Sequence, residues 1–417
     1  MFQAPRGTAD ILPEDQAYWR YVLQKAAAVS QLYGYRQIDT PVFEDTGLFT
    51  RSVGEETDIV QKEMYTLEDR GGSQLTLRPE GTAPVCRAYL EHGMQNLPQP
   101  VKLYYNFALY RYERPQAGRF REFHQFGCEA IGEVDPALDA EVIDMAWQFF
   151  FSLGLVQLRL KINSIGCKGC RPAYLARVKD YYAACQRELC PDCRARLERN
   201  PLRLLDCKNP SCQQIASAAP RSYENLCPEC AGHFAQLQKY LSLLNLPFEV
   251  DHCLVRGLDY YTRTVFEIQP ETEGAQNTLG AGGRYDDLIE ELGGRPTPAL
   301  GFAAGIERII VNLKKQNQNV PPSPDPLVYI AFLGDEARNR ALKLAGDLRR
   351  EGLSVIQSLG SKSLKSQLRQ ANTLGARYTA ILGEEEIQAG TVQLREMGTS
   401  RQQALPLAQL AEVLKGS

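Results

Sequence analysis

Residues 101–112 read VKLYYNFALYRY and residues 121–132 read REFHQFGCEAIG, and these two stretches decide the fold. The first is an apolar run. The second alternates, so that Gln125, Gly127 and Glu129 share one face of an extended chain. We therefore predict two neighbouring strands joined by a charged turn. Polar groups flank a glycine where a core would hold apolar side chains, which predicts a hollow above Gly127 that a ligand can enter.

Arginines crowd the turn between these two strands. They are Arg111, Arg114, Arg119 and Arg121. A guanidinium forms forked, charge-assisted hydrogen bonds, so arginines that converge near a hollow favour a phosphate ligand. The alternative is a purely structural ladder of salt bridges. Its members would be Arg111, Arg114, Glu113, Glu122 and Glu129.

Composition and charge narrow the class of protein. The chain has 417 residues, 44% of them hydrophobic and 23% charged, with a formal net charge of −3. This suits a globular protein of two or three domains, and it disfavours a partner held only by bulk electrostatics. The sequence contains no apolar run of the length that a membrane helix needs, and its N-terminus has no apolar signal core. We therefore expect a cytoplasmic protein that does not bind membranes.

Proline, glycine and periodicity divide the chain. The stretch at residues 35–44 predicts a short strand, and Pro41 inside it indicates an edge or an interface. After Pro79, Thr82 is a candidate cap for the next helix. Residues 316–326, QNQNVPPSPDP, have the composition of a linker. A separate α/β domain of alternating strands and helices follows.

Two further stretches bear on a ligand site. GAGGRY at residues 280–285 fits neither the dinucleotide fingerprint nor a P-loop, and it favours a tight turn with close backbone approach. LVRGLDYYTRTVFE at residues 254–267 places Arg256 before a glycine and a pair of tyrosines at the start of a strand. Surface aromatic packing is the alternative for the second stretch.

These stretches together resemble the histidyl-tRNA synthetases, a family of class II aminoacyl-tRNA synthetases. The motifs are RPEGT, YRYERPQAGRFREFHQFGCE, LVRGLDYY, AGGRYDDL and PALGFAAGIER. The likeness runs from APRGTADILP near the start to the C-terminal α/β domain. It implies an α+β fold with an antiparallel sheet flanked by helices. Residues 1–325 would form the catalytic domain, with a cysteine-rich insertion at about 166–246, and residues 326–417 an anticodon-binding domain.

The resemblance implies roles for individual residues. Arg111 and Arg256 resemble the catalytic arginines near the α-phosphate. The residues that resemble the ATP site are Arg111, Arg119, Phe123 and Arg308. Those that resemble the histidine site are Glu80, Gly81, Thr82, Gln125, Glu129, Arg256, Tyr260 and Tyr261. Within this set, Glu129 and Tyr261 would contact the imidazole, whose N–H would supply the donor that the buried carboxylate needs.

The family resemblance also implies substrates and partners. The chain would activate L-histidine with ATP and Mg²⁺ and transfer it to the 3′ end of tRNA(His), as a homodimer whose interface includes TPVFE at residues 40–44. In the C-terminal domain, Lys362, Lys365 and Arg369 would lie on adjacent helical turns and could contact phosphates. A solvated helix face is the alternative.

Two other functions remain open from the sequence. One is the synthetase-like regulatory subunit of ATP phosphoribosyltransferase, which is not an enzyme. The other is a nucleotide-binding module without catalysis. The regulatory group usually lacks the anticodon domain and loses residues of LVRGLDYY, and both are intact in this sequence.

Nine of the twelve cysteines fall between Cys167 and Cys230. Eight of them form closely spaced pairs: Cys167 and Cys170, Cys190 and Cys193, Cys207 and Cys212, Cys227 and Cys230. Such spacings are typical of tetrahedral zinc sites. Two four-sulfur sites, a single site, or reduced thiols without metal are all compatible with the sequence. Any zinc is expected to hold an insertion that contacts tRNA, far from the adenylation chemistry.

Overall fold

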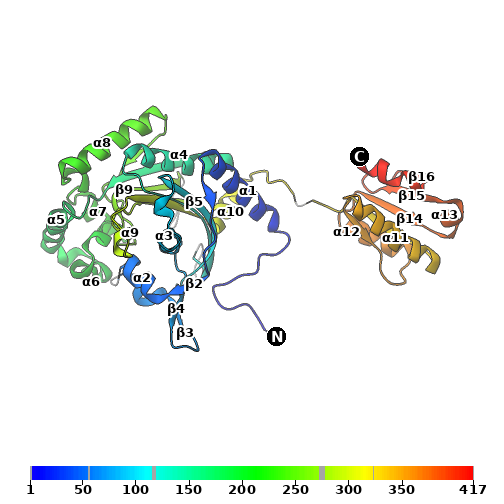
Figure 1. Cartoon of the computed structure of the whole chain (residues 1–417), viewed down its shortest axis with the longest axis horizontal. Helices are drawn as coiled ribbons and strands as arrows, with labels where there is room; N and C mark the ends of the chain where they lie inside the picture. The colour runs from blue at the N-terminus through cyan, green and yellow to red at the C-terminus, as the bar shows by residue number, and fades with distance from the viewer. Residues whose placement is uncertain (1, 55–56, 115–118, 272–277, 323, 417) are drawn as a thin grey trace. The chain divides into compact units, whose positions relative to one another are not determined.

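The computed structural model describes residues 2–54, 57–114, 119–271, 278–322 and 324–416. They fold into two compact units, Met1–Pro321 and Pro322–Ser417 (Figure 1). The boundary between the units lies inside residues 316–326. None of the described helices has the length and the hydropathy that crossing a membrane requires.

An eight-stranded sheet forms the centre of the first unit. In spatial order its strands are β1 (Arg36–Gln37), β5 (Val101–Tyr110), β6 (Glu122–Ile131), β11 (Ala299–Gly305), β10 (Gly280–Arg284), β9 (Thr262–Pro270), β7 (Leu158–Ser164) and β8 (Glu249–Val250). Each short edge strand is parallel to its neighbour, β1 to β5 and β8 to β7. All the other strand pairs of this sheet are antiparallel. The predicted antiparallel sheet is confirmed.

The strands β5 and β6 are the pair predicted from the opening stretches. They run antiparallel over ten residues each, with Leu109 opposite Phe123 and Tyr105 opposite Gly127. One face of β6 carries Phe126 and Cys128 into the core, while the other carries the polar side chains. Part of the predicted turn, residues 115–118, lies outside the described residues.

The glycine run is a central strand, so the prediction of a tight turn at residues 280–285 was wrong. β10 lies between β9 and β11, and it is buried throughout. A Cβ at Gly282 would collide with the carbonyl of Gly301, and one at Gly283 with the carbonyl of Thr264. Glycine is therefore needed here because neighbouring strands approach closely, rather than because the chain turns.

Four helices cover one face of the sheet. They are α1 (Gln16–Leu32), α4 (Pro136–Ser152), α8 (Pro228–Leu243) and α10 (Ile306–Lys315). The apolar stripe of α1 contributes Val22, Ala26 and Val29, and α4 contributes a nearly continuous apolar face. In Figure 1 these helices lie together along one side of the sheet.

The opposite face is covered only in part, which leaves room for a site. The helices α3 (Thr82–Glu91) and α9 (Leu288–Glu291) pack here with the insertion. A three-stranded sheet stands nearby, formed by β2 (Phe43–Asp45), β4 (Gln74–Leu77) and β3 (Tyr65–Glu68). Smaller elements are α2 (Thr46–Val53), η1 (Ile59–Glu63) and η2 (Met94–Asn96). The strand predicted at residues 35–44 is split around Pro41 into β1 and β2, and β1 is indeed an edge strand.

The insertion between β7 and β8 is helical. Before α8 it contains α5 (Arg171–Ala184), η3 (Gln186–Glu188), α6 (Pro191–Arg199), η4 (Pro201–Leu204), α7 (Pro210–Ser217) and η5 (Ser222–Glu224). Its helices before α8 pack on the partly covered face with α3 and α9, whereas α8 returns to the opposite face of the sheet.

The C-terminal unit is an α/β domain with its own cores. Its five strands, in spatial order, are β13 (Val355–Gln357), β12 (Val328–Phe332), β14 (Tyr378–Leu382), β15 (Thr391–Glu396) and β16 (Gln402–Pro406). Its helices are α11 (Asp335–Arg350), α12 (Leu364–Thr373), α13 (Glu384–Ala389), η6 (Leu407–Gln409) and α14 (Leu410–Lys415). The helix α11 buries Ala337, Ala341, Ala345 and Leu348.

Candidate active site

A cavity of about 260 Å³ opens on the partly covered face of the large sheet. Small residues of β10 and β11 form its floor: Gly280, Ala281, Gly301, Ala303 and Gly305. All but one of the predicted substrate-binding residues line it: Glu80, Gly81, Thr82, Arg111, Arg119, Phe123, Gln125, Arg256, Tyr260, Tyr261 and Arg308. The exception is Glu129, which lies buried beneath the cavity wall.

The predicted hollow above Gly127 does not exist. The ring of Tyr105, which pairs with Gly127 across the strands, fills this space, and a Cβ at Gly127 would collide with that ring. A Cβ at Gly81 would approach the same ring to 2.5 Å. The glycines thus accommodate a tyrosine, and the ligand cavity lies over β10 and β11 instead.

Glu129 accepts hydrogen bonds from three hydroxyl groups of the chain itself. The donors are Thr82 Oγ1 at 2.8 Å, Tyr105 OH at 3.1 Å and the hydroxyl of Tyr285. An imidazole N–H is therefore not needed to satisfy this carboxylate, although a carboxylate can accept about four such bonds. Burial raises the pKa of Glu129 to about 8, despite the hydroxyl donors.

Glu80 holds the start of α3. Its two oxygens accept from the backbone N–H groups of Thr82 and Ala83, each at 2.8 Å. The predicted capping role of Thr82 is therefore wrong, because its hydroxyl turns to Glu129 and Glu80 accepts the helix N–H groups instead. Burial raises the pKa of Glu80, opposed by these two backbone donors. Two carboxyl groups thus stand behind one end of the cavity.

Cations gather at the other end of the cavity. Arg119 Nη1 lies 3.2 Å from Glu113 Oε2, whereas Arg111 Nη1 is 4.0 Å from Glu113 Oε1. Of the alternative ladder of salt bridges, the described residues show only the contact between Arg111 and Glu113. Arg308 contributes Nη1, which donates to the carbonyl of Thr278 at 3.2 Å. Burial lowers the pKa of Arg308, and the nearby Arg119 and Arg111 add to this effect.

Arg111 is positioned by the backbone and by an aromatic ring. Its Nε donates to the carbonyl of Pro79 at 2.8 Å, and its guanidinium lies 5.3 Å from the ring centroid of Phe123. The proline before Glu80 therefore aligns the arginine, and Phe123 supplies a flat apolar wall beside it.

Arg256 reaches the cavity from the loop before β9. Its Nη1 lies 3.6 Å from Glu267 Oε2 on that strand, and its Nε is buried without a hydrogen-bond partner. A buried N–H group of a cation is costly to leave unpaired, so the geometry favours an anionic or carbonyl ligand at this point. Tyr260 and Tyr261 follow it, with ring centroids 4.8 Å apart, and both rings are buried.

Sequence reasoning missed three residues of the site. Tyr105 and Tyr285 both donate to Glu129 and line the cavity, and Glu267 pairs with Arg256. The sequence of β9 could have drawn attention to Glu267, because it is a carboxylate set between the apolar residues Phe266 and Ile268. No local signal distinguishes the two tyrosines from ordinary core residues.

The insertion contacts the site directly, contrary to the expectation that it lies far from the adenylation chemistry. Arg171, at the start of α5, donates to the carbonyl of Tyr261. A second cavity of about 380 Å³ is lined by Arg111 and Arg119 together with Arg196 and Arg199 of α6. The expectation failed because an insertion seen along the sequence gives no indication of which way its helices fold back.

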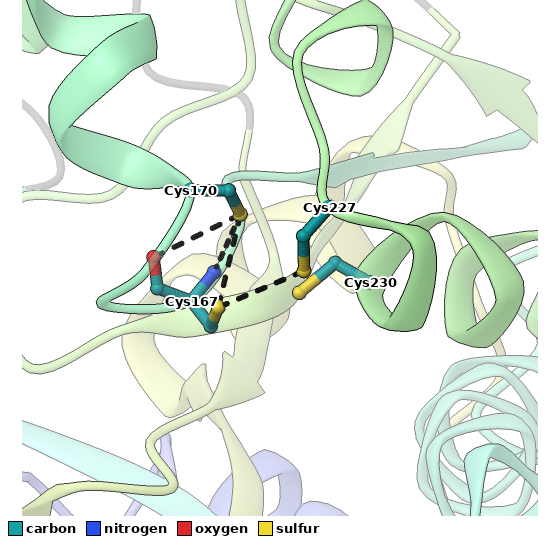
Figure 2. A group of neighbouring side chains, drawn as sticks. All are labelled: Cys167, Cys170, Cys227 and Cys230. Atoms are coloured by element: carbon teal, nitrogen blue, oxygen red, sulfur yellow. Dashed lines mark hydrogen bonds between the residues drawn. The ribbon is translucent and has the colours of Figure 1, made fainter.

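The eight paired cysteines form two groups. Cys167 and Cys170 meet Cys227 and Cys230, whereas Cys190 and Cys193 meet Cys207 and Cys212. Figure 2 shows the four sulfurs of the first group turned toward one another from the start of α5 and the start of α8. All twelve cysteines are free thiols.

In the C-terminal unit, the three predicted phosphate contacts are exposed around α12. Lys365 and Arg369 lie on the helix, while Lys362 precedes it and donates to Gln370 Oε1 at 2.8 Å. Ser363 is the N-cap of this helix, and its hydroxyl accepts from the N–H of Ser366.

An antiparallel sheet with helices behind it, and a cavity on its free face with arginines at one end, is the arrangement of class II aminoacyl-tRNA synthetases. Comparison with known proteins specifies the family. The sequence model of the histidyl-tRNA synthetase family matches residues 7–170 and 195–309. The family model of the anticodon-binding domain matches residues 327–417. The chain belongs to the histidyl-tRNA synthetase family.

Individual relatives match over nearly the whole chain. The histidine--tRNA ligase of Dehalococcoides mccartyi is 60% identical over 410 residues, which are 98% of each chain. That of Acetivibrio thermocellus is 49% identical over 413 residues, or 99% of each chain. Among solved structures, the apo histidyl-tRNA synthetase of S. aureus matches with a TM-score of 0.83 at 38% identity, covering 100% of both chains.

Proposed function

We propose that this chain activates L-histidine with ATP and transfers it to the 3′ end of tRNA(His). The observation that carries the proposal is the division of one cavity into a cationic end, with Arg111, Arg119 and Arg308, and an end backed by the carboxyl groups of Glu80 and Glu129. The first end suits the phosphates of ATP, and the second suits the amino and imidazole groups of histidine.

In the first step, the histidine carboxylate attacks the α-phosphate of ATP and displaces pyrophosphate. Two anions must approach each other, so the main task of the protein is to neutralise charge. Arg111 and Arg256 are proposed to flank the reacting groups, and the unpaired buried Nε–H of Arg256 can donate to an anionic oxygen. No general base is required because a carboxylate is already ionised at neutral pH.

The remaining residues are proposed to bind and orient the substrates. Arg119 and Arg308 would hold the β- and γ-phosphates of ATP, which enters with Mg²⁺ as substrate, and Phe123 would stack on adenine. Gly81, Thr82 and Gln125 would bind the α-amino end of histidine together with Glu80. Tyr260 and Tyr261 would enclose its side chain near Glu129. A buried polar site of this kind rejects isosteres that leave its groups unpaired.

The second step and the assembly extend the proposal beyond the cavity. Residues 1–325 would form the catalytic domain, and residues 326–417 would bind the anticodon, with Lys362, Lys365 and Arg369 at phosphates. A homodimer is proposed through residues 40–44. The exposure of Val42 and Phe43 beside Pro41 supports a second copy of the chain at this surface.

Histidine-dependent exchange between ATP and pyrophosphate tests the proposal. We expect exchange with histidine and none with the other standard amino acids, followed by charging of tRNA(His). A protein without exchange would instead be the non-catalytic regulatory subunit. The match to an anticodon-binding domain and the presence of Arg256, Tyr260 and Tyr261 in one cavity disfavour that alternative.

A further inference from the structure

The eight paired cysteines form two compact groups of four thiols. In each group every sulfur lies within 4.8 Å of the other three. The first group, which we name site A, consists of Cys167, Cys170, Cys227 and Cys230, and the second, site B, consists of Cys190, Cys193, Cys207 and Cys212. In the sequence, all four cysteines of site B lie between Cys170 and Cys227 of site A.

The sulfur separations fit a single metal ion. Cys167 and Cys170 are 3.8 Å apart, and Cys167 and Cys227 are 4.0 Å apart. In site B, the sulfurs of Cys190 and Cys207 are 3.9 Å apart. A tetrahedron with zinc–sulfur bonds of about 2.3 Å has edges of roughly 3.8 Å. A disulfide requires about 2.05 Å, so these distances do not describe oxidised pairs.

Helix starts and backbone donors stabilise negative charge at both sites. In site A, Cys170 and Cys227 are the N-cap residues of α5 and α8. In site B, Cys190 is the N-cap of α6, and Cys212 lies in the first turn of α7. The positive ends of two helices therefore face each group of sulfurs, which lowers the cost of four thiolates around one cation.

Backbone N–H groups contribute to the same effect. The N–H of Cys167 donates to Cys170 Sγ at 3.3 Å, and the N–H of Cys190 donates to Cys212 Sγ at 3.3 Å. Gly166 has a φ of 73°, and a Cβ there would lie 2.6 Å from Cys170 Sγ. The tight turn before Cys167 thus needs glycine to leave room for the sulfur.

A third group of metal-ligand types does not have these properties. Asp251, His252 and Cys253 are consecutive in one turn, and the carboxylate of Asp251 is paired with Lys161 Nζ at 2.8 Å. His252 Nε2 lies 3.2 Å from the carbonyl of Ala216. These ligand atoms are already engaged, in contrast to the two tetrathiolate groups.

We propose that sites A and B each bind one structural zinc ion through four cysteine thiolates. Zinc is favoured over an iron–sulfur cluster because the four sulfurs converge on one point, whereas the ligands of a cluster attach to separate iron atoms. With all four positions taken by sulfur, neither ion has an open position for catalysis, so both stabilise the fold.

Site A joins the insertion to β9, the strand that directly follows Tyr260 and Tyr261 of the cavity. The N–H of Ile165 donates to the carbonyl of Arg263 at 2.8 Å, and the N–H of Arg263 donates to the carbonyl of Gly166 at 2.9 Å. Arg171, directly after Cys170, holds the carbonyl of Tyr261. Zinc at site A therefore fixes the start of β9 against the insertion.

Site B holds the helices that face the arginine end of the cavity. Its ligands bracket α6 and η4, and α6 contributes Arg196 and Arg199 to the cavity shared with Arg111 and Arg119. The proposed zinc at site B thus orients cations toward the phosphate end, while the zinc at site A acts near the histidine end. This functional distinction rests on the proposed synthetase activity.

Metal analysis of the full chain, purified without added metal, tests both sites. We expect about two equivalents of zinc per chain, and X-ray absorption at the zinc edge should show four sulfur neighbours at about 2.3 Å. One equivalent would overturn the assignment of two sites. Less than half an equivalent, or iron in place of zinc, would overturn the proposal altogether.

Paired substitutions assign the metal to each site. Cys227→Ser with Cys230→Ser should retain one zinc, and so should Cys190→Ser with Cys193→Ser. The matched control is Cys185→Ser, which lies in the same insertion but outside both groups, and it should retain two. Loss of zinc in the control, or two zinc ions in either paired variant, would contradict the assignment. If a paired variant fails to fold, the zinc content and sulfur neighbours of the parent chain still decide the proposal.

The two paired variants should also differ in kinetics. Loss of site A should raise the KM for histidine more than that for ATP, and loss of site B should do the reverse. Equal changes in both constants would overturn the proposed division of roles. Zinc content is measured independently of activity, so failure of the metal sites can be distinguished from failure of the synthetase activity.

Discussion

At the residue scale, the cavity depends on charged groups that the chain itself only partly satisfies. The side chain of Arg256 is half-buried, and its buried Nε–H is unpaired, whereas Glu129 is buried with three hydroxyl donors. The first arrangement lacks an acceptor and suits an incoming anion. The second is nearly complete without ligand, but burial still raises the pKa of its carboxyl group, against the opposing effect of the hydroxyl donors.

Replacing Arg256 with alanine should slow adenylate formation while leaving the sheet intact. Loss of one preorganised donor at a developing phosphate charge costs about 3 kcal/mol, or roughly 10²-fold in rate. Single-turnover formation of histidyl-adenylate measures the effect. Arg159→Ala, which removes an exposed arginine from β7, is the control and should retain the parental rate. Equal rates for the two variants would rule out a role for Arg256 in the chemistry.

Histidine binding near pH 7 should release protons, in part from Glu129. Burial raises the pKa of this carboxyl group to about 8, so it is mostly protonated in the free protein at pH 7. A bound N–H donor or ammonium group favours the ionised form and lowers that pKa. Calorimetry in buffers of different ionisation enthalpy measures the number of protons released.

The proton release should fall in Glu129→Gln, which keeps the shape but cannot ionise. The same variant should raise the KM for histidine far more than that for ATP. Glu122→Gln, at the half-buried first position of the same strand, is the control and should release as many protons as the parent. Unchanged release in Glu129→Gln would show that this carboxyl group does not titrate on binding.

At the element scale, the sheet creates the site through the pairing of small with large residues across strands. Tyr105 fills the space over Gly127, and the glycines of β10 and β11 make the floor. Arg284, the last residue of β10, links this strand to α4. Its guanidinium is fully buried and lies 2.7 Å from Asp139 Oδ2 on that helix. His233 of α8 lies 3.1 Å from the other oxygen of that carboxylate.

Gly127→Ala should disturb the histidine end of the cavity through Tyr105. The added methyl group collides with the tyrosine ring, and overpacking of this kind typically costs 1–3 kcal/mol. We expect a higher KM for histidine with a smaller change for ATP. Gly232→Ala on α8 is the matched control, because no atom lies within 4 Å of its added Cβ, and it should be neutral. Identical kinetics for the two variants would contradict the role of Tyr105.

Arg284→Met should destabilise the first unit by about 3–5 kcal/mol, because it leaves the buried Asp139 without its main counter-charge. The midpoint of chemical denaturation, followed by a probe in this unit, measures the loss. The double variant Asp139→Leu/Arg284→Met should recover part of the loss because no unpaired charge remains. A double variant that is less stable than Arg284→Met would contradict this explanation.

At the scale of the whole molecule, two units with separate cores divide the proposed reaction. The cavity lies entirely within the first unit, and the proposed phosphate contacts on α12 lie within the second. Substitutions in the second unit should therefore change charging of tRNA without changing the activation of histidine.

Lys365→Glu with Arg369→Glu should raise the KM for tRNA about tenfold, equivalent to about 1.4 kcal/mol, and should weaken its salt dependence. Exchange between ATP and pyrophosphate should remain at the parental level. Lys343→Glu, at an exposed position on α11, is the control for a change of charge in the same unit. An equal effect of the control would indicate general repulsion of tRNA rather than contact through α12.

The sequence by itself determined the central strand pair, the linker composition and the residue types of the site. These features depend on periodicity and on neighbours along the chain, which a sequence contains directly. The family resemblance added the order of the motifs, and with it ten more positions besides Arg111 that line the same cavity.

Only the tertiary structure decided which groups meet across long separations. It placed Tyr105 over Gly127, turned Thr82 toward Glu129, and folded the insertion back against the cavity. It also paired Cys167 with Cys227 rather than with the next cysteine pair along the chain. The physical reason is the same in each case: such contacts are set by how helices and strands pack, and the local pattern of residues is equally compatible with several arrangements.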